Sequence, residues 1–246
     1  MDYTNLVNDV TFWISGDSTS TVDYTAADIN ANLNNYYNEI VSIIMSADGR
    51  WEWDDSNLTT LPIATTNMVA GQGDYAVDAA DFLNLIRVEI KDSSGDWITI
   101  EPMSYEDKQD VTITGLDDTN ATPLMYDKVG GSIILHPKPN YSSTAGIKAF
   151  YQRTPDYFLT TDTTQAPGFN PLYHRYLSMG AALDFCMINS MDNRVTLLTT
   201  KMADIKQMIK DDYSKRSRDE KLRMSVNVED YGNSRGYTVS PDRIDW

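Results

Sequence analysis

Few side chains of this sequence could do nucleophilic chemistry. It contains two histidines, His136 and His174, and one cysteine, Cys186. A catalytic serine or cysteine needs a base beside it, and imidazole is the usual one. His136 ends a predicted strand and His174 lies in the first turn of a predicted helix, and neither belongs to a recognisable catalytic motif. We therefore expect both histidines to have structural roles.

The single cysteine excludes an internal disulfide and any zinc site built from several cysteines. Cys186 lies on the apolar face of the predicted helix, which indicates a buried and unreactive thiol rather than a nucleophile.

Carboxylates are abundant, with 36 Asp and Glu residues in the chain. Asp54-Asp55, Asp92 with Asp96, and Asp117-Asp118 could supply oxygen ligands, but none belongs to the alternating loop with a closing Glu that binds calcium. We interpret them as solvated turn carboxylates. Gly71-Gln72-Gly73 precedes a strand rather than a helix, so it indicates no phosphate site. The sequence predicts no catalytic residue, no metal and no cofactor.

The charge of the chain is strongly negative and unevenly placed. The net charge is −16, but residues 201–223 contain eight Lys or Arg and five Asp or Glu, a local balance of +3 that leaves −19 elsewhere. A body this acidic is not expected to bind duplex DNA, because that binding needs clustered Lys and Arg. The basic segment is either a solvated helix face, the default interpretation, or a tail that meets an acidic partner.

Length and hydropathy bound the class of protein. At 246 residues with 41% apolar side chains, the chain can form one large domain or two small ones with a real core. No apolar run approaches the roughly 20 residues that a membrane span needs. The first residues lack the features of a signal peptide, so we expect a soluble protein not secreted by that route.

Helical spacing of apolar residues predicts helices at both ends of the chain. They cover residues 2–14, residues 25 to about 47 with a capping box at Thr25 and Asp28, and Asn170 to about Arg216. The last element is two helices or one broken helix, with a pause at residues 189–193. Its Gly180-Ala181-Ala182 suggests close approach by another backbone, although ordinary core packing is the simpler interpretation.

Between the helices the apolar period changes to that of strands separated by turn signals. The predicted strands are Ile63–Ala70, Asp74–Val77, Leu85–Lys91, Trp97–Glu101, Leu124–Lys128, Ser132–His136 and Gly146–Arg153. This pattern predicts an α+β fold, in which residues 1–50 and 168–213 form a helical bundle and residues 51–167 form an inserted antiparallel β-sandwich or barrel. Residues 214–246 form an extended C-terminal arm.

The order of several short motifs resembles the head-to-tail adaptor, or connector, family of tailed bacteriophages, the group that includes tail tubular protein A. The resemblance covers about Trp51 to Ile188 and ends in the Gly-Ala-Ala helix. The motifs are Trp51-Glu52-Trp53, Leu61-Pro62, Gly73-Asp74-Tyr75-Ala76-Val77, Ile86-Arg87-Val88, residues 122–126, residues 131–139, residues 150–155, and the acidic stretch from Asp162 to Pro171-Leu172-Tyr173.

The resemblance implies a structural protein of the virion at the head-tail junction, assembled in the host cytoplasm, and not an enzyme. Members form a ring, commonly of twelve copies, under the portal protein. The ring extends the DNA channel and carries the tail or nozzle protein, and genomic DNA passes through it without sequence-specific binding. Two alternatives stay open: a receptor-binding or baseplate β protein, and a carbohydrate-active hydrolase that uses a carboxylate pair on the β body.

The resemblance also assigns contact residues. The C-terminal arm would bind the portal through Lys215, Arg216, Arg218, Lys221, Arg223, Val226, Val228, Tyr231, Tyr237 and Trp246. A ring would bury apolar helix faces through head-to-tail contacts, and the expected interface residues are Leu33, Tyr37, Tyr176, Gly180, Leu198 and Met202. An acidic ring wall would let DNA slide past because it repels phosphates.

Overall fold

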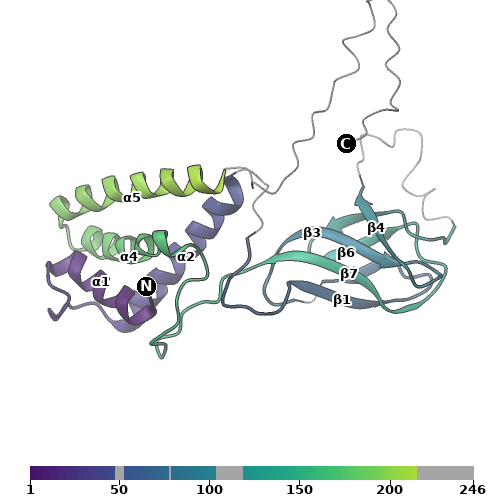
Figure 1. The fold of residues 1–246 in the computed structure, drawn as a ribbon, viewed down its shortest axis with the longest axis horizontal. Coiled ribbons are helices and arrows are strands. Elements are labelled where there is room, and N and C mark those ends of the chain that lie inside the picture. Colours follow the sequence, from purple (N-terminus) through teal and green to yellow (C-terminus); the bar gives the residue numbers. More distant parts are fainter. Residues whose placement is uncertain (48–52, 78, 104–118, 215–246) are drawn as a thin grey trace, which may run out of the picture. The chain divides into compact units, whose positions relative to one another are not determined.

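The computed structural model of the chain describes residues 1–47, 53–77, 79–103 and 119–214 (Figure 1). Contacts between residues divide the chain into two units, Met1–Lys215 and Arg216–Trp246. The first unit combines helices and strands, as the predicted α+β class requires. The predicted C-terminal arm, residues 214–246, lies almost wholly outside the described residues.

The helices are α1 (Tyr3–Ser15), α2 (Ala26–Ala47), the short 3-10 helix η1 (Pro171–Tyr173), α4 (Arg175–Ile188) and α5 (Asp192–Tyr213). One half of the predicted capping box of α2 is present, because the Thr25 hydroxyl accepts a hydrogen bond from the Asp28 N–H. The Asp28 carboxylate accepts in return from the Thr25 hydroxyl. The predicted pause at residues 189–193 separates two helices, and the chain turns there through Ser190, whose φ is +56°.

α4 is the central helix, and α1, α2 and α5 each pack against it. Its sequence explains this position, because side chains from Tyr176 to Ala182 are buried all round the helix. A Cβ on Gly180 would lie 2.3 Å from Cγ of Tyr36 in α2. The closely approaching group is therefore an aromatic ring and not a second backbone, and the simpler interpretation of the Gly-Ala-Ala trio, core packing, is confirmed.

All seven predicted strands are present. They are β1 (Ile63–Met68), β2 (Asp74–Ala76), β3 (Phe82–Lys91), β4 (Trp97–Pro102), β5 (Met125–Val129), β6 (Ser132–His136) and β7 (Ser143–Arg153). β3 and β7 each begin three residues before their predicted starts. The strands form one sheet in the order β1-β7-β3-β4-β5-β6-β2.

The expectation of a purely antiparallel sheet was wrong at one pair. β4 and β5 are parallel, with Glu101 opposite Met125, whereas the other pairs are antiparallel. The physical reason is the long connection between these strands, residues 103–124. A hairpin joins antiparallel neighbours, whereas parallel neighbours need a crossover of about a dozen residues or more.

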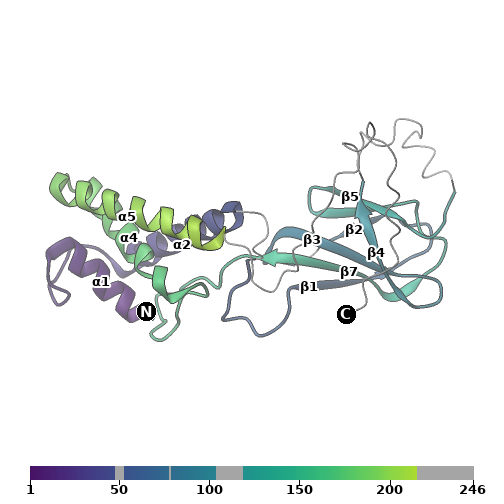
Figure 2. The same ribbon diagram turned by 45° about the horizontal axis from the view of Figure 1, so that its top comes forward.

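The sheet curls into a nearly closed barrel, which decides between the two predicted β architectures (Figure 2). Its core consists of the inward side chains of alternate strand positions, among them Tyr75, Val88, Ile90, Leu135 and Ile147. The barrel stays open between β1 and β2, the two end strands of the sheet. A cavity of about 320 Å³ lies there, lined by both strands and by core residues such as Ile133 and Ala149.

Candidate functional site: a buried junction and the predicted contact residues

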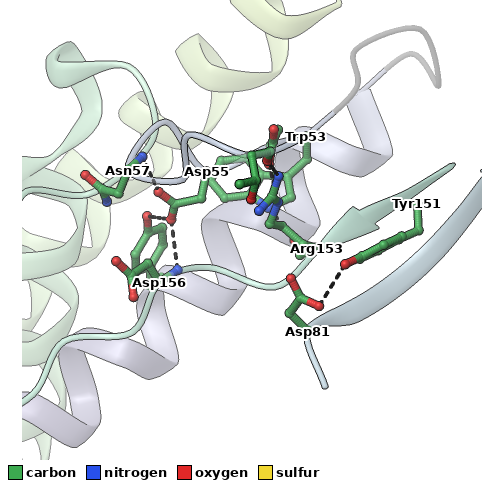
Figure 3. A network of polar contacts seen from close by, with 10 residues as sticks. Trp53, Asp55, Asn57, Asp81, Tyr151, Arg153 and Asp156 are labelled. Atoms are coloured by element: carbon green, nitrogen blue, oxygen red, sulfur yellow. Dashed lines mark hydrogen bonds and ion pairs between the residues drawn. The ribbon is translucent and has the colours of Figure 1, made fainter. Parts of the chain in front are cut away.

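The helices and the barrel have separate apolar cores, and the chain segments that connect them carry a buried polar network (Figure 3). Asp55 is its centre and is 1% exposed. Its carboxylate accepts hydrogen bonds from the Tyr37 hydroxyl at 2.6 Å and from the backbone N–H groups of Asn57 and Asp156, each at 2.9 Å. The expectation of a solvated turn carboxylate is therefore wrong for Asp55, because these three donors replace water.

Tyr37 extends the network to Gly168. The Tyr37 hydroxyl accepts a hydrogen bond from the Gly168 N–H at 2.6 Å while it donates to Asp55. Burial and the Asp55 carboxylate raise the pKa of Tyr37 well above its ordinary value. The phenol therefore stays protonated and serves as a fixed donor. A Cβ at Gly168 would lie 1.9 Å from Asp55 Oδ1, so the Gly168 backbone packs directly against the carboxylate.

A second set of contacts holds the end of β7. Arg153 is 3% exposed, and its Nε lies 2.7 Å from Asp54 Oδ1 in an ion pair that is not aligned as a hydrogen bond. The same guanidinium donates to the Thr60 carbonyl. The Arg153 carbonyl accepts from the Trp53 indole N–H at 2.8 Å. Nearby, the Tyr151 hydroxyl donates to Asp81 at 3.0 Å (Figure 3).

Trp53 joins these contacts to the helical core. It is 4% exposed, and its ring packs edge-on against Tyr37 with ring centroids 6.3 Å apart. Trp53 therefore covers the edge of the helical core, and Trp51 lies outside the described residues. The junction thus fixes the segments before β1 and after β7 by ring packing, ion pairing and hydrogen bonds.

The histidines and the cysteine have the structural surroundings that were predicted. His174 is 2% exposed, with Nε2 2.9 Å from the Phe169 carbonyl and Nδ1 2.8 Å from the Met1 nitrogen, and burial lowers its pKa. His136 is 5% exposed. Cys186 is fully buried and burial raises the pKa of its thiol, so a reactive thiolate is disfavoured.

Of the remaining candidate metal ligands, Asp92 with Asp96 lies in a turn. Asp92 is the first residue of a tight loop, and its Oδ1 accepts from the N–H groups of Ser94 and Asp96 at 2.8 and 2.9 Å. Asp117-Asp118 lies outside the described residues. Across the described part of the chain, no three His, Cys, Asp or Glu side chains are placed to hold a metal ion. None of the helices within these residues is long and apolar enough to cross a membrane.

The structure places the six predicted ring-interface residues inside the helical core of the chain itself. Their exposed fractions run from 0% to 6%, and Gly180 is also buried: Leu33, Tyr37, Tyr176, Gly180, Leu198 and Met202. Side chains so buried leave almost no surface for a neighbouring chain. A ring contact on these helices would use exposed side chains, such as Leu197 and Met208 of α5. The assignment of the helices to a ring interface stays a prediction.

The predicted portal-binding residues lie outside the described residues, and their assignment also stays a prediction. They are Lys215, Arg216, Arg218, Lys221, Arg223, Val226, Val228, Tyr231, Tyr237 and Trp246.

The sequence did not predict that Asp55, Arg153 and Gly168 are buried in the junction. The one local signal for their burial was the acidic pair Asp54-Asp55, which directly follows the core residue Trp53. A carboxylate next to a core residue needs hydrogen-bond donors from other parts of the chain.

The chain was compared with protein-family models and with curated proteins. A family model described as SU10 adaptor protein matches residues 1–228 of the 246. The match therefore spans the described helices, the barrel and the whole basic segment at 201–223. No curated protein matches the chain significantly.

Proposed function

This chain belongs to the SU10 adaptor protein family of phage head-to-tail adaptors, and we propose that it forms a ring under the portal that extends the DNA channel and carries the tail. Membership of the family implies a structural role at the head-tail junction, with portal and tail components as partners. The single observation that carries the proposal is the match over residues 1–228, which includes every described helix and strand.

The ring is the first element of the proposal, with twelve copies as the family resemblance suggests. A head-to-tail ring has no free ends, so each copy needs two different surfaces that fit each other. The acidity of the chain supports a channel role, because a net charge of −16 per copy repels a passing phosphate backbone. DNA would then pass through the ring without sticking to its wall.

The C-terminal arm is the second element. Residues 214–246 carry five Lys or Arg between Lys215 and Arg223, followed by apolar and aromatic residues up to Trp246. This composition suits an acidic groove on the portal, with the basic part steering the arm and the aromatic part anchoring it. An arm that orders only on its partner would also make portal docking a distinct assembly step.

A structural role agrees with the chemistry of the junction. Asp55 is surrounded by donors of its own chain, and His174 bonds a backbone carbonyl, so neither is presented to a substrate. The adaptor family is a family of structural proteins, and the junction residues act in this account only by fixing the segments that lead into and out of the barrel.

Negative-stain microscopy of the full-length protein, alone and mixed with its cognate portal protein, tests the proposal. We expect rings that stack coaxially on the portal. Compact monomers or trimers that ignore the portal would contradict it and would favour a receptor-binding or baseplate protein. Hydrolysis of cell-wall glycans by the same preparation would favour the hydrolase instead.

A further inference from the structure

The outer surface of the barrel carries two faces of opposite charge. The first, called here the basic face, lies on β7, β3 and β4 and consists of Arg87, Glu89, Lys91, Trp97 and Lys148. The strand registers align these residues, since Glu89 stands opposite both Lys148 and Thr99, and Lys91 stands opposite Trp97. Their neighbours Val88 and Ile90 point into the core, so the basic face points outward.

Trp97 is the centre of the basic face. Its ring is covered by two ammonium groups, with Nζ of Lys148 3.7 Å and Nζ of Lys91 5.2 Å from the ring centroid. The tryptophan is still 37% exposed. Arg87 pairs with Glu89 at 2.6 Å, so these two charges cancel. The two lysines beside Trp97 then outweigh the exposed Glu101 on the same side of β4 and leave a surplus of one positive charge. An exposed tryptophan between cations is typical of an interface hot spot.

The second, called here the acidic face, lies on β5, β6 and β2 and consists of Asp127, Ile134 and Asp74. Ile134 stands opposite Asp127 on one side and opposite Asp74 on the other, so the three form one row across the strands. The preceding and following positions Tyr126, Leu135 and Tyr75 are buried. The row therefore points outward, and it presents an apolar side chain between two carboxylates.

The two faces lie on nearly opposite sides of the barrel. In the strand order, β3 at the centre of the basic face and β6 at the centre of the acidic face are three places apart in a seven-stranded sheet that nearly closes. Figure 2 shows β7 and β3 on one side of the barrel and β5 and β2 on the other. A subunit of a closed ring needs this arrangement, since it meets one neighbour on each side.

We propose that the basic face of one copy docks on the acidic face of the next, with Trp97 against Ile134 and the two lysines against Asp74 and Asp127. The inference rests on the proposed ring and names its contact surfaces. The occupant is a second copy because every chain carries both faces, so each face has a partner of opposite charge on any other copy. Copies that each carry −16 repel one another overall, so an interface between them needs such local charge complementarity.

The test uses two full-length charge-reversal variants. Variant one carries Lys91→Glu and Lys148→Glu, and variant two carries Asp74→Lys and Asp127→Lys. Each alone would set like charges against each other, so we expect its assembly, measured by mass photometry, to need about tenfold more protein or higher. An equimolar mixture restores opposite charges at every interface of an alternating ring, so assembly returns to the wild-type range. Thr161→Glu, an exposed loop change outside the helices and outside both faces, is the control and assembles as wild type.

A milder pair, Lys91→Gln with Lys148→Gln, weakens assembly in the same direction and covers the case in which a reversed chain folds poorly. Normal rings from variant one would overturn the inference and leave the proposed function intact. Rings that form normally but lose a portal or nucleic-acid contact would also overturn it, because the basic face would then serve another partner. A wild-type chain that forms no ring, alone or with portal, would instead overturn the proposed function.

Discussion

At the scale of single residues, the closest packing in the junction is between Gly168 and Asp55. A Cβ at position 168 would lie 1.9 Å from Asp55 Oδ1, inside any allowed contact. We expect Gly168→Ala to lower the free energy of unfolding by about 2–4 kcal/mol, because it displaces a buried carboxylate from its donors. Urea unfolding measures the change.

The matched control for this substitution is Gly131→Ala. A Cβ there meets no atom within 4 Å, and the residue is exposed with no positive φ. We expect a change within about 0.5 kcal/mol. Equal effects of the two substitutions would show that the junction is looser than the contacts of Asp55 indicate.

His174 gives the chain a pH dependence with a definite sign. Burial lowers its pKa from 6.5, so below about pH 6.5 the unfolded chain binds a proton that the folded chain refuses. The free energy of unfolding should therefore fall as the pH drops below this value, until the lowered folded pKa is reached.

The measurement compares urea unfolding of wild type and His174→Gln between about pH 8 and about pH 5. The variant loses the histidine contribution, so its stability should change less over this range even if it is lower throughout. Parallel curves for the two proteins would mean that the His174 imidazole is protonated as easily in the folded chain as in the unfolded one.

The sequence predicted the structural roles of some single residues and missed the burial of Asp55. His136 and His174 were predicted to be structural because neither belongs to a catalytic motif, and Cys186 because it lies on an apolar helix face; all three are buried. Asp55 lies in a polar loop, where its type indicates exposure. Its donors come from positions 37, 57 and 156, and no local pattern can show that the fold brings these groups together.

At the scale of elements, the contact between α2 and α4 is set by Gly180. Replacement by alanine gains about 1 kcal/mol of helix propensity but inserts a Cβ 2.3 Å from the Tyr36 ring, which costs about 1–3 kcal/mol through displaced packing. We expect the packing cost to prevail, with a net loss of stability.

Thermal unfolding of Gly180→Ala checks this expectation, with Tyr36→Ala combined with Gly180→Ala as the test of mechanism. Once the ring is absent, the alanine at position 180 has room, so the double variant should lose less than the sum of the single changes. Strict additivity would show that the ring and the glycine do not constrain each other.

Element positions were predictable because their signals are local. A period of 3.6 places α1, α2, α4 and α5, and a period of two places the seven strands. The pairing of β4 with β5 was not predictable in the same way. Whether two strands run parallel depends on the path of residues 103–124 between them, and apolar alternation within each strand carries no information about that path.

At the scale of the whole molecule, positive and negative charges lie in different regions of the chain. The chain is acidic overall, its basic residues gather at 201–223, and the barrel has one outward face with a surplus of lysine. The first property follows from composition alone. The basic face could be recognised only from strand register, because Lys91, Trp97 and Lys148 come from three strands.

The whole-molecule prediction concerns ring assembly and salt. If copies meet through opposite charges, the concentration needed for assembly should pass through a minimum as salt rises, because salt first screens the repulsion between chains of charge −16 and then screens the contacts themselves. Mass photometry across a salt series checks this. A steady improvement of assembly up to about 1 M salt would indicate an apolar interface instead.

If this chain joins the portal through its C-terminal arm, removal of the arm should weaken equilibrium binding to the cognate portal. The full-length protein is compared with a chain that ends after Tyr213, just before the boundary of the first compact unit. We expect saturable binding by the full-length chain and at least about hundredfold weaker binding by the truncated one, since anchor residues contribute most of the affinity at an interface. Equal binding by both chains, or none by the full-length protein, would contradict it.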